Sequence, residues 1–480
     1  MKHRFEFRFI PLLSAALMLI ISSCTHSGNW PQFRGPDGNM IAANKILPDT
    51  WGNDKNIKWT YEINGTGWSS PVVWGNRVFI TSTFPEKVAP VPEMGPGGPQ
   101  PQPDQSPQQS QRPQPGQGPQ QGQGSRPGQA PGGPMPEDTS YKAEIYRWDI
   151  TCVDLGTGKQ IWKQTPYHGS PRTAKQPMST YANETPVTDG KRVYAYFGMT
   201  GLYCYNMDGK LLWKNDLGTY KTQNGWGTGS STVLYKDILY IQADNEVHSF
   251  IVAIDAATGK EKWRADREEK TNYSTPFIWK NSTRTELVTN GNSIRSYDLI
   301  TGKVLWELKT GFEQAIPSPV ADENHLYIGN KAGMQTKGRF YAVRAGADGD
   351  ITPKDSLTLG SWLEWVTSDA GLGSGSPLLY QGLLYNIGGK GEITVTSAAD
   401  GKQVYKNRIN GMGSVWATSW ASNGKIFFFD EKGVTHVLKA GAQFGQISEN
   451  KLSDKFWASV AIAGDKLVFR GVEKLWCIGK

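Results

Sequence analysis

The chain has 480 residues, of which 38% are hydrophobic and 11% aromatic, with 55 glycines, 29 prolines and 18 tryptophans. A chain of this length can bury a large core, and its glycine and aromatic content favours strands and turns over helices. The formal net charge of +7 is spread along the sequence without a basic tract, which argues against a nucleic-acid-binding protein.

The N-terminus predicts a lipoprotein signal peptide over residues 1–23. A basic start is followed by an apolar stretch shorter than the ~20 residues that cross a bilayer, and by small residues before Cys24. The sequence "LIISSC" resembles a bacterial lipobox, which implies that Cys24 is lipid-modified and becomes the new N-terminus. No aspartate follows it directly, which by resemblance to enterobacterial lipoprotein sorting implies the outer membrane, facing the periplasm. The alternative is an ordinary signal peptide cleaved near Ser23. Residues 24–55 are expected to form an N-terminal anchor segment between the signal peptide and the propeller.

A tract of proline, glutamine and glycine runs through residues 90–136. Such a composition lacks the apolar residues that a packed core needs, so we expect this insertion to be disordered. We interpret it as a spacer, with a docking tail as the alternative.

One turn motif returns along the chain. It reads "AIDAATGKEKW" at 253–263, and related versions lie at 152–162, 204–213 and 296–306. Glycine takes the left-handed conformation of a tight turn and the aspartate carboxylate accepts turn N–H groups, so the motif predicts β-hairpins. The tryptophan that ends each copy would face water on an isolated hairpin, and burying such a ring stabilises by roughly 2–3 kcal/mol. We therefore expect the next copy to cover it.

A second motif precedes the turn. A hydroxyl residue, often followed by proline, leads into a strand, a polar turn and another strand, and eight copies occur, mostly about forty to fifty residues apart. This period predicts an all-β fold, an eight-bladed β-propeller with four antiparallel strands per blade, over residues 56–480. The eighth copy ends after its third strand. A lone N-terminal strand at 56–63, which carries Trp59, is expected to complete it and close the ring.

These motifs, with "WPQFRGPDGN" at 30–39 and "YANETPVTDGKRVYAYFG" at 181–198, resemble the PQQ-binding-like eight-bladed propellers. That family is related to quinoprotein alcohol dehydrogenases and to outer-membrane assembly lipoproteins of the BamB type. The resemblance implies that the repeated tryptophans dock each blade on the next; they are Trp59, Trp162, Trp213, Trp263 and Trp306. The fifth and seventh copies, "VRAGADGDI" and "LKAGAQFGQI", lack this tryptophan, and the sixth has Tyr405.

The catalytic features of the quinoprotein relatives are not found in the sequence. There is no adjacent cysteine pair and no CxxCH haem motif, and the six histidines are scattered without metal-ligand spacing. We therefore predict no catalytic residue, no metal site and no cofactor, with PQQ as the cofactor of the alternative function. Glu184 is the one acid that stands out, and a surface position is favoured for it. Cys152, Cys204 and Cys477 are expected to be small buried residues.

The sequence thus favours a monomeric, non-catalytic binding or scaffold propeller of the bacterial cell envelope, held by a lipid anchor. Its expected partners are other envelope proteins, as in outer-membrane protein assembly, or an unknown ligand. One alternative is a divergent PQQ-dependent dehydrogenase. Another is a carbohydrate or peptide binder, whose candidate contacts besides Glu184 are Trp362, Trp365, Trp416 and Trp420, although packing between blades is favoured for these tryptophans.

Overall fold

The computed structural model describes residues 28–42, 47–87, 139–331, 338–354, 359–368 and 370–480. The predicted signal peptide, Cys24 and the 90–136 tract lie outside these residues. No helix in the described part of the chain is long and apolar enough to cross a membrane.

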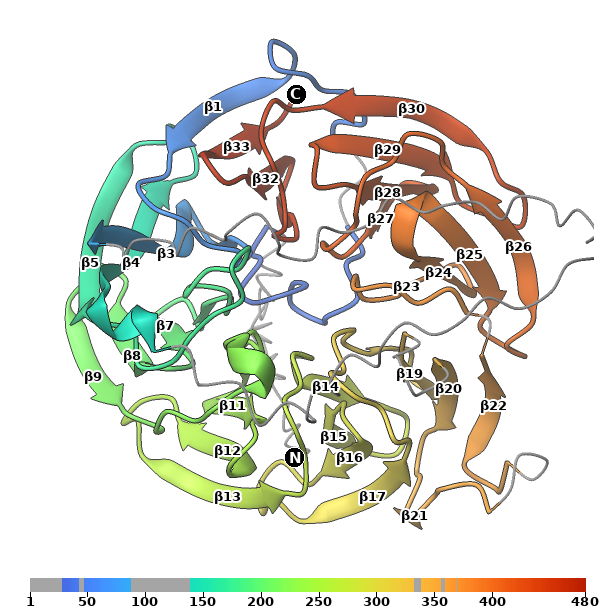
Figure 1. Ribbon diagram of the computed structural model, residues 1–480. Coiled ribbons are helices and arrows are strands. Elements are labelled where there is room, and N and C mark those ends of the chain that lie inside the picture. The colour runs from blue at the N-terminus through green and yellow to red at the C-terminus, as the bar shows by residue number, and fades with distance from the viewer. Residues whose placement is uncertain (1–27, 43–46, 88–138, 332–337, 355–358, 369) are drawn as a thin grey trace, which may run out of the picture.

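Eight antiparallel sheets stand side by side in a ring (Figure 1). The first four blades contain β2–β5, β6–β9, β10–β13 and β14–β17. Their strands are β2 (Val72–Trp74), β3 (Arg77–Lys87), β4 (Ile145–Asp154), β5 (Gln160–Gly169), β6 (Val187–Thr188), β7 (Arg192–Phe197), β8 (Gly201–Asn206), β9 (Leu211–Asn215), β10 (Val233–Tyr235), β11 (Ile238–Ala243), β12 (Ser249–Asp255), β13 (Glu261–Arg267), β14 (Phe277–Lys280), β15 (Thr285–Thr289), β16 (Ser293–Tyr297) and β17 (Val304–Lys309).

Blades 5 to 8 follow the same plan. Across the described residues of the whole ring, three short 3-10 helices lie between strands. Their strands are β18 (Val320–Ala321), β19 (His325–Asn330), β20 (Arg339–Arg344) and β22 (Leu363–Thr367); β23 (Leu378–Tyr380), β24 (Leu383–Ile387), β25 (Glu392–Ser397) and β26 (Gln403–Arg408); β27 (Trp420–Ser422), β28 (Lys425–Phe429), β29 (Val434–Lys439) and β30 (Gln446–Lys451); β31 (Ala461–Ala463), β32 (Lys466–Arg470), β33 (Lys474–Ile478) and β1 (Ile57–Glu62). β21 (Gly349–Asp350) adds a parallel pairing to β17, and the 3-10 helices are η1 (Ser140–Ala143), η2 (Gln223–Gly225) and η3 (Gly389–Gly391).

The ring closes as the sequence predicts. β1 pairs antiparallel with β33, so that Trp59 lies opposite Cys477 and the two ends of the chain share blade 8 (Figure 1). The middle strands of a blade, such as β7 and β8, are buried between neighbouring sheets, whereas the outer strand β9 is largely exposed. This difference explains why the middle strands read as continuous apolar runs.

The repeated tryptophans contact the turn of the following blade. In five blades the indole N–H donates to a backbone carbonyl at 2.8–3.2 Å; the pairs are Trp59 and Leu155, Trp162 and Met207, Trp213 and Ala256, Trp263 and Leu299, and Trp365 and Ala398. Each ring covers a glycine of positive φ, where a Cβ would come within 2.5–2.8 Å of the indole. The glycine of the turn is therefore required both by its backbone conformation and by the ring above it.

Trp306 and blade 5 differ from the other copies. The Trp306 indole donates to the Glu286 carboxylate of its own blade at 2.8 Å, and β21 pairs alongside it. The expectation that blade 5 lacks a docking tryptophan is wrong, because an inserted segment that includes β21 precedes the outer strand, and Trp365 on that strand does the docking. Tyr405 and Ser448 occupy the tryptophan position in blades 6 and 7.

An N-terminal segment, residues 29–42, crosses one end of the central channel, and we call it the strap. Its Trp30 exchanges two 2.8 Å backbone hydrogen bonds with Val73 in blade 1, and Ile41 pairs with Ala421 in blade 7. Met40 of the strap is fully buried. The segment predicted as an anchor is thus packed in part against the propeller itself.

Candidate functional site

A ring of hydroxyl side chains surrounds the channel. Each blade contributes one residue, placed two positions before its innermost strand: Ser70, Thr185, Ser231, Thr275, Ser318, Ser376, Thr418 and Ser459. Around the ring, seven backbone N–H groups donate to the hydroxyl of the adjacent blade at 2.9–3.1 Å. The hydroxyl of the second sequence motif therefore ties neighbouring blades together and lines the channel.

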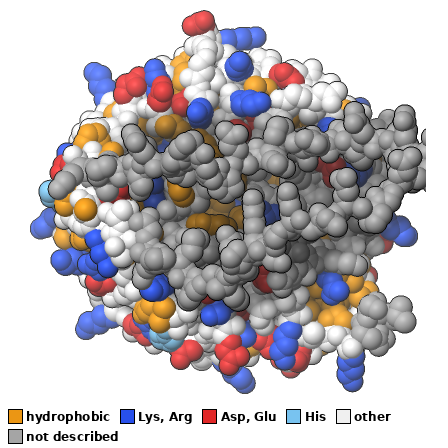
Figure 2. All heavy atoms as spheres, in the orientation of Figure 1, with side chains coloured by type: hydrophobic (Ala, Val, Ile, Leu, Met, Phe, Trp, Pro, Cys, Tyr) orange, Lys and Arg blue, Asp and Glu red, His pale blue; other side chains and the backbone are white. Residues whose placement is uncertain are grey.

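A funnel opens above this hydroxyl ring. It is a cavity of about 480 Å³, and the strap's Phe33 also lines it. Hydrophobic side chains are visible in the shaded hollow near the centre of the face in Figure 2. Among the described residues that line the funnel, Lys331 is the one charged side chain.

Tryptophans gather at the mouth of the funnel. The rings of Trp68 and Trp457 stack with centroids 5.1 Å apart and planes 10° apart, and Trp416 lies 6.4 Å from Trp68. Trp226 also lines the funnel, and Trp226 and Trp416 remain 37% and 41% exposed. Exposed tryptophans around a concave, mostly apolar cavity are typical of a ligand or protein-binding site.

A simple spacing explains this cluster. Trp416, Trp457 and Trp68 each lie two residues before the ring hydroxyl of blades 7, 8 and 1, which are neighbours around the ring. The same offset places Tyr273 at the funnel in blade 4. Trp68, Trp226 and Trp457 were not predicted from the sequence, although the offset of two residues before the ring hydroxyl distinguishes Trp68 and Trp457.

The candidate contacts from the sequence divide between the funnel and the core. Of the four tryptophans proposed, Trp416 reaches the funnel. Trp420 is fully buried and stacks on Phe427 at 4.9 Å, and Trp365 docks blade 5 on blade 6. Trp362 is half-buried and packs against the core between blades 4 and 5.

Glu184 is buried, with 1% of its surface exposed, and not at the surface as expected. Its carboxylate accepts hydrogen bonds from the Gly198 N–H at 3.2 Å and from the Thr228 hydroxyl, and Thr228 lines the funnel. Burial raises the pKa of Glu184, although these hydrogen bonds oppose the shift. Glu184 itself does not line the funnel: its carboxylate is held in the interior by Gly198 and by Thr228, which separates it from the cavity.

A buried ion cluster links blades 3 and 4. The Arg267 guanidinium donates to the Asp244 carboxylate at 2.7 and 3.1 Å and lies 3.8 Å from Glu269. All three side chains are fully buried, and Glu269 also accepts the Asn292 and Ser293 N–H groups. Because these carboxylates are engaged within the protein, the cluster is structural.

The three remaining cysteines are buried free thiols, as expected. Burial raises the pKa of Cys152, Cys204 and Cys477 to about 12, so their thiols stay protonated and unreactive at neutral pH.

The funnel does not match the donor set of a quinone cofactor. PQQ is a polycarboxylate, whose recognition needs several cationic or amide donors. The described lining supplies one cation, Lys331, and the amides of Gln176, Asn183 and Gln314, of which those of Asn183 and Gln314 already donate within the protein. The described residues also contain no group of three or more His, Cys, Asp or Glu placed to hold a metal ion.

Residues 147–346 match the family model described as outer membrane protein assembly factor BamB. The chain is similar to this family over that segment, which is less than half of its length. Two solved structures share the fold of this propeller: a europium-containing methanol dehydrogenase (TM-score 0.60, 10% identity, 94% of this chain and 91% of that one) and the quinohemoprotein alcohol dehydrogenase of Comamonas testosteroni (TM-score 0.56, 12% identity, 95% and 81%).

One curated relative is the tetrathionate hydrolase of Acidithiobacillus ferrooxidans. It is 26% identical to this chain over 268 residues, which are 54% of this chain. The matched stretch spans 41% of that relative's own length.

Proposed function

We propose that this eight-bladed propeller is a lipid-anchored protein of the cell envelope that binds a polypeptide partner at its central funnel. In this role it is a non-catalytic scaffold for outer-membrane protein assembly. The observation that carries the proposal is the tryptophan cluster of three adjacent blades at the funnel mouth. The match to an assembly-factor family supports the envelope role.

The chemistry of the funnel favours a polypeptide over a sugar or a quinone. Faces of Trp68 and Trp457 are turned toward each other rather than left open for a sugar ring. The Asn183 amide donates to Ser179 and Thr228, and the Gln314 amide donates to Gln223, so these donors are engaged within the protein. Apolar side chains of a peptide would bury the exposed tryptophan surface without demanding further polar partners.

Binding of a labelled peptide tests this proposal. The probe is an amphipathic strand peptide that alternates aromatic and polar residues, followed by fluorescence anisotropy. Trp68→Ala and Trp416→Ala should each weaken binding about thirtyfold, the effect of losing a central aromatic contact worth about 2 kcal/mol. Trp362→Ala, a half-buried tryptophan outside the funnel, is the matched control and should leave binding unchanged.

Two further titrations separate the alternatives. Calorimetry with a β-linked hexasaccharide tests the carbohydrate binder, and calorimetry with PQQ and Ca²⁺ tests the divergent dehydrogenase. Saturable binding of either one without peptide binding would replace the proposal by that alternative. Equal peptide affinity in the parent, Trp68→Ala and Trp416→Ala would remove the funnel as the binding site.

The lipid anchor is tested by Cys24→Ala. We expect this variant to leave the membrane fraction of the cell, because acyl chains supply the anchoring free energy, about 0.8 kcal/mol per buried CH₂. Cys152→Ala removes a buried thiol and should stay with the membranes. Recovery of Cys24→Ala in membranes at the parent level would contradict the anchor.

A further inference from the structure

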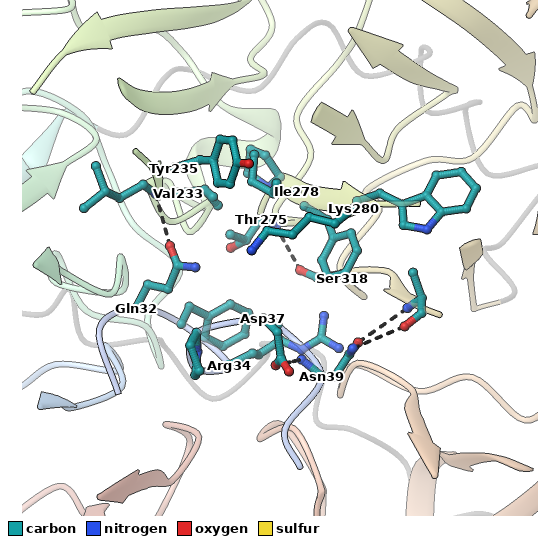
Figure 3. A pocket seen from close by; sticks show the side chains of 18 of the residues that line it. Gln32, Arg34, Asp37, Asn39, Val233, Tyr235, Thr275, Ile278, Lys280 and Ser318 are labelled. Carbon is teal, nitrogen blue, oxygen red and sulfur yellow. Dashed lines mark hydrogen bonds between the residues drawn. The ribbon is translucent and has the colours of Figure 1, made fainter. Parts of the chain in front are cut away.

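A second cavity lies at the strap, at the other end of the channel from the funnel mouth. Its volume is about 240 Å³, and it is enclosed by strap residues 32–39 and by the inner strands of blades 3, 4 and 5 (Figure 3). Phe33, Thr275 and Ser318 line both this strap cavity and the funnel. The strap therefore divides the channel into two compartments.

Arg34 lies in the wall of the strap cavity and is 2% exposed. Its Nη1 donates to the Pro319 carbonyl at 2.6 Å, whereas Nε and Nη2 have no hydrogen-bond partner. These two nitrogens form one edge of the guanidinium, on which two N–H bonds point the same way, the edge that grips a carboxylate or another oxyanion. An unpartnered buried charge is costly, so an oxyanion that reaches this edge from the cavity would relieve that cost.

Arg34 remains a cation at neutral pH. Burial lowers its pKa to about 9, and the charge of Asp37 opposes this shift. A second cation, Lys280, also lines the cavity, with its ammonium 5.4 Å from the centre of the Tyr235 ring (Figure 3).

The acidic residues of the strap cavity are Asp37, Asp322 and Glu323. Asp37 accepts the Asn39 N–H at 3.0 Å. Asp322 is occupied by its own turn, where it accepts the Asn324 and His325 N–H groups. The carboxylates of Asp37 and Asp322 therefore accept hydrogen bonds within their own turns, and neither is hydrogen-bonded to the free edge of Arg34. That edge is left for a ligand.

We propose that the strap cavity binds one small carboxylate or oxyanion on the Nε and Nη2 edge of Arg34. The anion replaces the missing hydrogen-bond acceptor and compensates the buried charge. Lys280 adds attraction, and Asp37 limits the affinity by repulsion. The site is separate from the funnel, and its test does not depend on the identity of any funnel ligand.

Equilibrium dialysis with radiolabelled sulfate and calorimetry with acetate test the site on the full chain, at constant ionic strength maintained with chloride. The parent should bind one equivalent in a saturable manner, and the two probes distinguish a tetrahedral oxyanion from a planar carboxylate. Arg34→Lys should bind roughly tenfold more weakly, because an ammonium cannot present the paired N–H edge. Asp37→Asn should bind more tightly, because it removes the repelling charge and keeps the acceptor for Asn39.

Arg470 supplies the matched control. Its guanidinium is as buried, and its Nε and Nη2 are also without partners, but it lines neither the funnel nor the strap cavity. Arg470→Lys should bind the anions like the parent. The proposal is overturned if the parent shows no saturable binding, if Arg34→Lys equals the parent, or if Asp37→Asn binds more weakly.

Discussion

Trp59→Ala is expected to lower the free energy of unfolding by about 3–5 kcal/mol, as truncation of a large buried ring does. Trp59 is 8% exposed, donates to the Leu155 carbonyl at 2.8 Å and covers Gly158. It lies at the junction where blade 8 meets blade 1, so its loss weakens the contact that holds the two ends of the chain together. Urea denaturation of the variant and the parent measures the difference.

Two further variants test whether the loss of stability comes from ring closure: one removes an exposed tryptophan and the other removes the closing strand. Trp226→Ala, at a 37% exposed ring in the funnel, should cost no more than about 0.5 kcal/mol, as surface changes usually do. Deletion of residues 57–62 should be worse than Trp59→Ala, because it exposes the edge of β33 and favours aggregation. A deletion variant as stable as the parent would show that β1 is not needed to close the ring.

Arg267→Met is expected to destabilise the protein by about 3–5 kcal/mol, because it leaves the buried Asp244 carboxylate without its counter-charge and removes one of the two cations that pair with Glu269, the other being Arg295 at 3.4 Å. Arg267 also donates to the Thr289 and Tyr297 hydroxyls at 2.6 and 2.8 Å, and these bonds are lost with it. Arg172→Met is the matched control. Arg172 pairs with Asp216 at a partly exposed site, where an ion pair contributes about 0–1 kcal/mol.

The cost of Arg267→Met should depend on pH. Burial already raises the pKa of Glu269, and Arg267 opposes that shift. Without Arg267 the folded-state pKa rises further above the unfolded value of about 4.3, so the carboxyl gains a proton on folding in the range between the two values. The penalty is therefore largest at pH 8 and is relieved as the pH falls toward 5. Denaturation at both pH values measures this, and an equal loss at both would contradict the buried-carboxylate explanation.

The sequence by itself determined the blade count, the turn of the blades that carry the Asp-Gly motif and the closing strand. These are local features repeated at a fixed period: Asp255 accepts the Thr258 N–H at 2.9 Å and Gly259 takes a φ of 73°, as "DAATG" predicts. A repeated motif also predicts how its copies pack, because five of the eight blades contact the next through the same indole-to-carbonyl hydrogen bond. For this reason the pairing of β1 with β33 could be predicted from an incomplete last copy.

Only the tertiary structure decided which residues meet at the channel. Trp68 and Trp457 are 389 positions apart in sequence numbering (457 − 68) and stack only because blades 8 and 1 become neighbours when the ring closes. The strap has no repeat to reveal its path, so the place of Arg34 in the wall of the strap cavity could not be predicted from the sequence. Trp365 could not be recognised as the docking residue of blade 5, because an inserted segment that includes β21 precedes the outer strand of that blade. Contacts that repeat from blade to blade depend on residues close together in the sequence, so the sequence predicts them. Loops and insertions that meet at the channel come from distant parts of the sequence, and only the closed ring brings them together.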